Sequence, residues 1–413
     1  MKTSFLNKEC IPKWLFLTIA FSTNIWTLSW FDLKFYQYFH IIIMIFLIWN
    51  IFKYRNTKLT QCYSKSFVIA LCLLPLLSIY SCKILHEQSM VASLTVWRMH
   101  LGWLLYFTLW YKQINEQQCI KVICYIGIIY AIITLFQQIT YPFAPFGSRT
   151  IGAGFTEKFT GGIVEKRMGF YRFGVEGVSY AAAALFICIA RKIHYKHFKL
   201  LVLCLILSII ACGNRQTIAS VFAAYCYYLL YNNNVKNKIG YVILICCIIL
   251  FLYTFRESLF GSLANVSEDL ESGRSFSYIY YFNEYISNPL SIFLGNGVGH
   301  ESSAYGSEAV FFDNKQVILS DIGMVGTLFY WGGIYVLTYF IAIFRLLRNR
   351  YLDTHIKAII LAPILVSWIS TPLWEFGGMI SQSLLLYYCD INIKNNKLKY
   401  KELNENSIRI RNK

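Results

Sequence analysis

The sequence has 413 residues, of which 57% are hydrophobic and only 14% are charged, and its formal net charge is +17. Apolar runs of about 18 to 20 residues, the length a membrane-spanning helix needs, recur along most of the chain, which excludes an ordinary soluble protein. Segments such as "HIIIMIFLIWN" and "YVILICCIILFLY" do not alternate apolar and polar residues as the strands of a membrane barrel would. We therefore expect an all-α polytopic membrane protein that forms a single integral membrane domain.

Twelve spans are expected in chain order. They cover residues 12–31, 35–52, 66–82, 91–110, 120–140, 175–190, 198–212, 216–231, 239–255, 320–344, 356–371 and 377–393. The first span lacks a small-residue cleavage site, so we expect a signal anchor rather than a cleavable signal peptide.

The lysines and arginines concentrate in alternate connections between the spans. One set carries 26 of them and consists of residues 1–13, 53–65, 112–121, 191–199, 232–238, 345–357 and the basic tail 394–413. The short connections of the other set carry three. The positive-inside rule then predicts that both termini and the first set face the cytoplasm. This distribution accounts for the net charge, so we expect no nucleic-acid partner.

The first long outer connection, residues 141–174, is basic. It contains Arg149, Lys158, Lys166, Arg167 and Arg172. An arginine offers a planar fork of donors that fits phosphate oxygens, so the cluster predicts an outward-facing site for a lipid-linked phosphate or diphosphate. A solvated loop is the alternative, because long loops cross the membrane largely regardless of their charge.

The second long outer connection, residues 256–317, is acidic, with eight Asp and Glu residues between Glu257 and Asp313. Within it, "RSFSYIYYFNEYISNPL" has apolar residues at helical spacing and predicts an amphipathic helix on the membrane surface. The glycine-rich "GNGVGH" predicts a turn, and "SDIGMVG" opens the next span.

Arg215 lies where two apolar runs meet, in "ACGNRQTIASVFA". An arginine at such a place costs several kcal/mol unless another group receives its charge, so it is a candidate for function. Two acidic residues have plainer interpretations: we expect Glu176 to pair with an arginine and Glu375 to lie at the membrane interface. Of the thirteen cysteines, none lies in either long outer connection, so we expect neither a disulfide framework nor a cysteine-based metal site.

Four segments, taken in order, resemble the O-antigen polymerase and ligase superfamily. They are "YRFGVEGVSYAAAALF", "ACGNRQTIASVFA", "GRSFSYIYYFNEYISNPLSIFLGNGVGH" and "ILSDIGMVGTLFYWGG". The resemblance implies a multi-span helical glycosyltransferase at the outer face of the bacterial inner membrane. Its substrate would be an undecaprenyl-diphosphate-linked oligosaccharide, with no nucleotide donor, cofactor or metal. The resemblance is also compatible with a chain-length regulator protein as a further partner.

The resemblance also implies roles for individual residues. Arg172, Arg215 and Arg274 are expected to converge on the donor diphosphate. Arg149 or Arg167, next to Lys166, would retain the second lipid-linked substrate. The candidates for the general base are Asp313, Asp321, Glu284 and His300, with Asp321 as first choice; His300 is also a candidate for substrate binding.

The choice between polymerase and ligase depends on one missing histidine. Ligases of this superfamily carry a histidine followed at a set distance by Gly-x-x-Gly. Here Gly323 and Gly326 are present, but the corresponding region reads Asp313-Asn314. We therefore favour a polymerase over a ligase or related glycan transferase. A flippase or other transporter is the main alternative of another class, yet the sequence has no repeated halves. A third interpretation is a structural or scaffold membrane protein whose outer loops bind a partner.

Overall fold

The computed structural model describes residues 10–23, 25–28, 33–57, 62–141, 143–147, 166–167, 170–171, 173, 175–191, 198–232, 239–241, 243, 273–284, 288–300, 302–308, 311–312, 315–316, 322–369 and 375–411. The described part is helical apart from two small hairpins. These pair β1 (Lys166–Arg167) with β2 (Phe170–Tyr171) and β3 (Phe311–Phe312) with β4 (Lys315–Gln316). The expected all-α class is confirmed.

The helices of the first half of the chain are α1 (Lys13–Ser22), α2 (Leu33–Lys53), α3 (Lys65–Leu73), α4 (Leu76–His86), α5 (Met90–Trp97), the 3₁₀ helix η1 (Arg98–Trp103), α6 (Leu104–Tyr111) and α7 (Glu116–Thr140). The second half contains α8 (Val178–Arg191), α9 (Phe198–Ala211), α10 (Arg215–Tyr231), α14 (Gly273–Glu284), α15 (Pro289–Leu294), α16 (Ala304–Glu308), α17 (Gly323–Arg348), α18 (Thr354–Ile369) and α19 (Phe376–Arg411).

Three of these helices are long and apolar enough to cross a membrane. They are the combined α3 and α4 (Lys65–His86), α7 and α17. The chain is thus an all-α protein with membrane-spanning character, but the described residues do not show the twelve spans that the sequence predicts. Several expected spans form apolar helices of only 10 to 17 residues, which are shorter than the roughly 20 residues that a bilayer requires.

Local backbone breaks explain part of this difference. The first expected span ends early, because α1 stops at Ser22 and Thr23 leaves the helical conformation. The expected span 91–110 is divided into α5, η1 and α6. Most of the expected span 239–255 lies outside the described residues. Hydropathy predicts where an apolar stretch lies. Whether the helix within that stretch is interrupted depends on the tertiary contacts of each turn.

The amphipathic helix predicted from the second outer connection is present as α14. It buries Ser277 and Tyr281, one helical turn apart, and exposes Ile279 and Phe282. Tyr281 packs with Cys82, Tyr305, Ile322 and Phe329 in a small second core next to the main one. One apolar edge of α14 therefore has no cover among the described residues.

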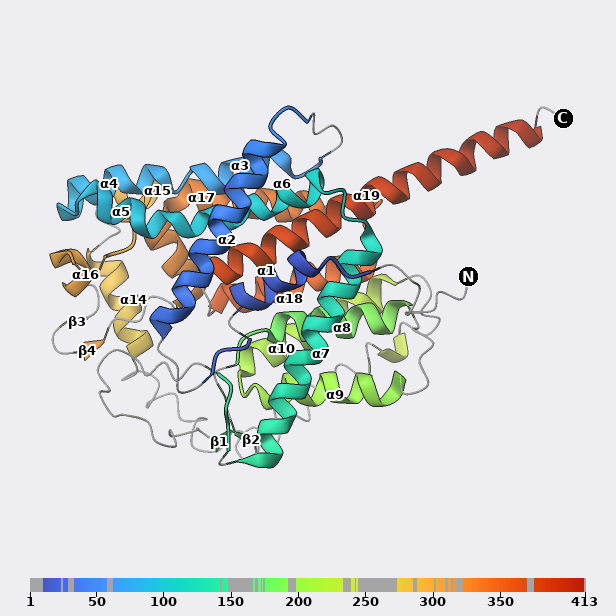
Figure 1. Cartoon of the computed structure of the whole chain (residues 1–413), viewed down its shortest axis with the longest axis horizontal. Helices are drawn as coiled ribbons and strands as arrows, with labels where there is room; N and C mark the ends of the chain where they lie inside the picture. The colour runs from blue at the N-terminus through green and yellow to red at the C-terminus, as the bar shows by residue number, and fades with distance from the viewer. Residues whose placement is uncertain are drawn as a thin grey trace.

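Close helix packing sets the central part of the fold. At Gly127 of α7, an added Cβ would lie 2.6 Å from the Tyr180 carbonyl oxygen, so only glycine lets α8 come so near. α10 packs on α18, and α19 contacts η1, α6, α1 and α7. α19 accordingly runs through the middle of the bundle, and its C-terminal part projects beyond the body (Figure 1).

Candidate functional site

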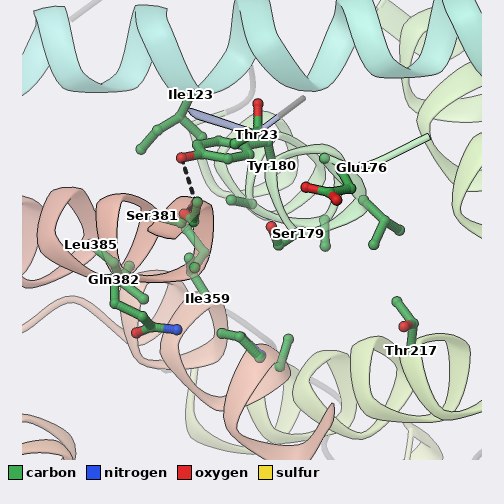
Figure 2. A pocket seen from close by; sticks show the side chains of 18 of the residues that line it. Thr23, Ile123, Glu176, Ser179, Tyr180, Thr217, Ile359, Ser381, Gln382 and Leu385 are labelled. Atoms are coloured by element: carbon green, nitrogen blue, oxygen red, sulfur yellow. Dashed lines mark hydrogen bonds between the residues drawn. The ribbon is translucent and has the colours of Figure 1, made fainter. Parts of the chain in front are cut away.

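A cavity of about 360 Å³ lies between α8, α10, α18 and α19. Its lining is mostly apolar, and its polar groups come from different helices. Thr217 of α10 faces it from the side opposite Ser381 and Gln382 of α19 (Figure 2). Such a shape, an apolar hollow with a few polar groups, is typical of ligand sites.

Three helices begin at this cavity. Gly177 precedes α8, Asn214 precedes α10 and Glu375 precedes α19, and all three residues line it. The Asn214 side chain accepts hydrogen bonds from Gln216 N (3.1 Å) and Thr217 N (3.2 Å), so it caps α10. A helix start carries a partial positive charge, and three starts at one cavity favour an anionic group there.

A hydrogen-bonded pair joins two walls of the cavity. The Ser381 hydroxyl donates to the Gly377 carbonyl oxygen at 2.8 Å. The serine has one hydroxyl hydrogen, so the Tyr180 hydroxyl is the donor in its 2.8 Å bond with Ser381 Oγ (Figure 2). This chain of bonds ties α8 to the first turn of α19 and holds the cavity wall in place.

Two carboxylates, Glu176 and Glu375, line the cavity. Glu176 already takes part in an interaction within the protein, and its expected pairing with an arginine stays a prediction. Glu375 behaves differently: none of the described residues hydrogen-bonds to its carboxylate or pairs with it. The Glu375 side chain is exposed to the cavity, yet the protein atoms around it displace water, disfavour the charged form and raise the pKa of its carboxyl above the ordinary value.

The sequence-predicted Arg215 is the first residue of α10, directly after the Asn214 cap. Its backbone therefore stands at a helix start that borders the cavity, while its side chain is outside the described part. Arg149, Arg172, Asp313 and Asp321 lie outside the described residues altogether. The convergence of Arg172, Arg215 and Arg274 stays a prediction.

Lys166 and Arg167 form the strand β1, opposite Tyr171 and Phe170 respectively. The hairpin is attached to the end of α7: Tyr171 N donates to Gln138 Oε1 at 2.9 Å, and Gln138 Nε2 donates to the Tyr171 carbonyl oxygen at 2.5 Å. Tyr171 also stacks on Tyr141, with 3.9 Å between the ring centroids. The backbone of the two basic residues is thus held on a hairpin attached to α7, while their side chains are outside the described part.

Arg274 and Glu284 stand at opposite ends of α14, and their side chains are outside the described part. His300 ends the predicted glycine-rich turn and does not line the cavity. Its backbone N–H donates to Gln88 Oε1 at 2.8 Å, and its Nδ1 accepts the Ser302 N–H at 3.2 Å. Nδ1 also lies 2.8 Å from the Ser302 hydroxyl, so this side of the His300 ring faces Ser302.

The cavity itself and its Glu375 were not predicted from the sequence. The one available signal was an acidic residue in an outer connection, "TPLWEF", that contains no lysine or arginine. Chemically, the arrangement offers a helix-start region suited to an anion, an arginine at one of those starts and, at another, a carboxylate with no partner among the described residues. No protein-family model matches this chain, and no curated protein matches it.

Proposed function

We propose that this protein polymerises undecaprenyl-diphosphate-linked oligosaccharide repeat units for O-antigen or another surface polysaccharide. It would act as a glycosyltransferase at the outer face of the bacterial cytoplasmic membrane. The observation that carries the proposal is the position of Arg215, in the first turn of α10 beside a cavity where α8 and α19 also begin. The order of the four sequence segments supports it independently.

The proposed chemistry explains why an arginine belongs at this place. A sugar hydroxyl of one repeat attacks the anomeric carbon of the other chain, and the bond from that carbon to the diphosphate oxygen breaks. Negative charge grows on the leaving diphosphate as this bond lengthens. A guanidinium group at the positive start of α10 stabilises that charge.

The lipid part of the substrate suits the rest of the molecule. The cavity is mostly apolar, and α14 exposes Ile279 and Phe282, with 52% and 55% of their surfaces accessible. We propose that α14 lies on the outer membrane surface, within an external segment 256–317, and that 141–174 is external too. Both termini would be cytoplasmic, and a chain-length regulator protein would be a further partner in the membrane.

The first test is deletion of the gene followed by a gel of the surface polysaccharide. A polymerase deletion leaves a single repeat on the lipid core, because units are still made, flipped and ligated. Loss of all repeats from the core would contradict the proposal and indicate a ligase or a flippase.

The second test restores the deletion strain with Arg215 variants. We expect Arg215→Ala to abolish long chains and Arg215→Lys to shorten them, since lysine keeps the charge but loses the two-pronged contact with phosphate. Arg348→Ala, in the last turn of α17, is the matched control and should give a full ladder. A full ladder from Arg215→Ala at normal protein level would exclude the proposed role of Arg215.

A further inference from the structure

The proposed transfer needs a group that removes a proton from the attacking sugar hydroxyl. General bases act within hydrogen-bond distance of that hydroxyl, directly or through one water. With the diphosphate at the start of α10, a base on the opposite wall of the cavity faces the reacting sugar. The wall formed by α19 meets this requirement, because Thr217 of α10 faces it across the cavity (Figure 2).

We infer that Glu375 is the general base of this transfer, an assignment that rests on the proposed function. Its side chain is accessible and lines the cavity. The oxygen that attacks forms a bond to the anomeric carbon while its proton moves to a Glu375 carboxylate oxygen. The electron pair of the broken carbon–oxygen bond leaves with the polyprenyl diphosphate, so no other reactant is needed.

The backbone around Glu375 is held in place by three contacts. The Glu375 carbonyl oxygen accepts the Met379 N–H at 3.0 Å, which fixes the residue at the start of α19. A Cβ on Gly377 would lie 2.4 Å from the Ser22 carbonyl oxygen, so this turn is pressed against the end of α1. Ser381 bonds to Gly377 and is itself bonded by Tyr180. A base must be positioned in this way to meet a bound hydroxyl.

The carboxylate of Glu375 is also available for the reaction. No described residue forms a hydrogen bond or an ion pair with this carboxylate, whereas Glu176 already has an interaction partner. The protein atoms around this carboxyl raise its pKa above the ordinary value, and a base is more effective when its pKa is closer to the working pH. His300, the other described candidate, contacts Ser302 through Nδ1 and does not line the cavity.

The test measures elongation by the purified full-length protein in lipid nanodiscs. The substrate is an undecaprenyl-diphosphate-linked repeat, varied in concentration. We expect Glu375→Gln to lower kcat by about 100- to 10,000-fold and to change KM by less than about threefold. Glu375→Asp, which keeps the carboxylate but withdraws it by one methylene, should lose about 10- to 100-fold in kcat with the same small change in KM.

Two further variants serve as comparisons. Glu176→Gln, the other carboxylate of the cavity, should keep a kcat at least about tenfold above that of Glu375→Gln. Glu405→Gln, on the exposed end of α19, should elongate like the wild type. The unfolding temperature of each variant is measured in parallel. If Glu375→Gln does not fold, the kcat of Glu375→Asp alone tests the assignment of Glu375 as the base.

The possible results separate this inference from the function on which it rests. Wild-type elongation together with wild-type kcat in Glu375→Gln or Glu375→Asp would overturn the assignment and leave the polymerase proposal standing. A loss in Glu176→Gln as large as in Glu375→Gln would also overturn it. A folded wild-type protein that does not elongate the substrate would overturn both.

Discussion

Gly295 and Gly332 pack backbone against backbone. A Cβ added to Gly295 would lie 2.6 Å from Gly332 N, and one added to Gly332 would lie 2.5 Å from Gly295 N. Both residues have positive φ angles, +79° and +78°, and Gly332 breaks the helical conformation within α17. The glycine-rich turn that the sequence predicts therefore packs against the kink in α17, a candidate membrane span.

The turn supplies the hydrogen bonds that the kink would otherwise leave unmade. Asn296 N donates to the Phe329 carbonyl oxygen at 2.8 Å, and Gly297 N donates to the Tyr330 carbonyl oxygen at 2.9 Å. Broken helices are tolerated at membrane depth only where such partners satisfy the freed backbone groups. The kink in α17 and the turn after α15 consequently depend on each other.

The first prediction is that Gly332→Ala destabilises the protein by about 2–4 kcal/mol, from the clash and the unfavourable positive φ. The apparent unfolding temperature of the purified protein in detergent should fall clearly. Gly378→Ala is the control, because a Cβ there meets nothing within 4 Å. Equal unfolding temperatures for Gly332→Ala and the wild type would refute the mutual dependence of kink and turn.

The second prediction concerns Glu116, the first residue of α7. Its carboxylate pairs with Arg191 at 2.6 Å and accepts hydrogen bonds from Asn395 (2.8 Å) and Asn392 (3.3 Å) of α19. Glu116→Ala leaves Arg191 without its carboxylate, and we expect a loss of about 1–3 kcal/mol.

A surface ion pair of the same chain gives the matched control for Glu116. Lys401 and Glu405 are 3.8 Å apart, with 76% and 57% of their side chains exposed. Water screens such a pair, so Glu405→Ala should cost less than about 0.5 kcal/mol. Thermal unfolding of both variants checks the difference, and an equal effect would show that the Glu116 cluster contributes nothing beyond a surface pair.

The third prediction tests the topology. Alkaline phosphatase is active only outside the cytoplasm, so a fusion after residue 300 should be active and a fusion after residue 236 inactive. The reason is the concentration of 26 lysines and arginines in one set of connections, against three in the short connections of the other. The reverse pattern would put the proposed chemistry in the wrong compartment.

The fourth prediction is that elongation continues in excess chelator. The two long outer connections contain no cysteine, and the carboxylates of "SEDLESGR" are not spaced as in a calcium loop. The arginines would supply the positive charge that a metal supplies in other phosphate-releasing enzymes. Activity that EDTA removes and a divalent ion restores would contradict this expectation.

The sequence by itself determined the membrane character, the all-α class and the position of most helices, including α14. These properties are local, because hydropathy, helical periodicity and capping residues act within a few turns. The described residues form fewer full spans than the sequence predicts. An apolar stretch of sufficient length does not reveal that its helix will stop at Ser22 or change to a 3₁₀ turn at Arg98.

Only the tertiary structure decided which residues meet. Glu375 and Tyr180 are far apart in the chain, yet both line one cavity, because α8 and α19 are joined through Ser381. The packing of Gly295 against Gly332 likewise requires both the turn and α17 to be folded. Contacts of this kind leave no periodic pattern in the sequence, since close packing and buried hydrogen bonds depend on the arrangement of several elements in space.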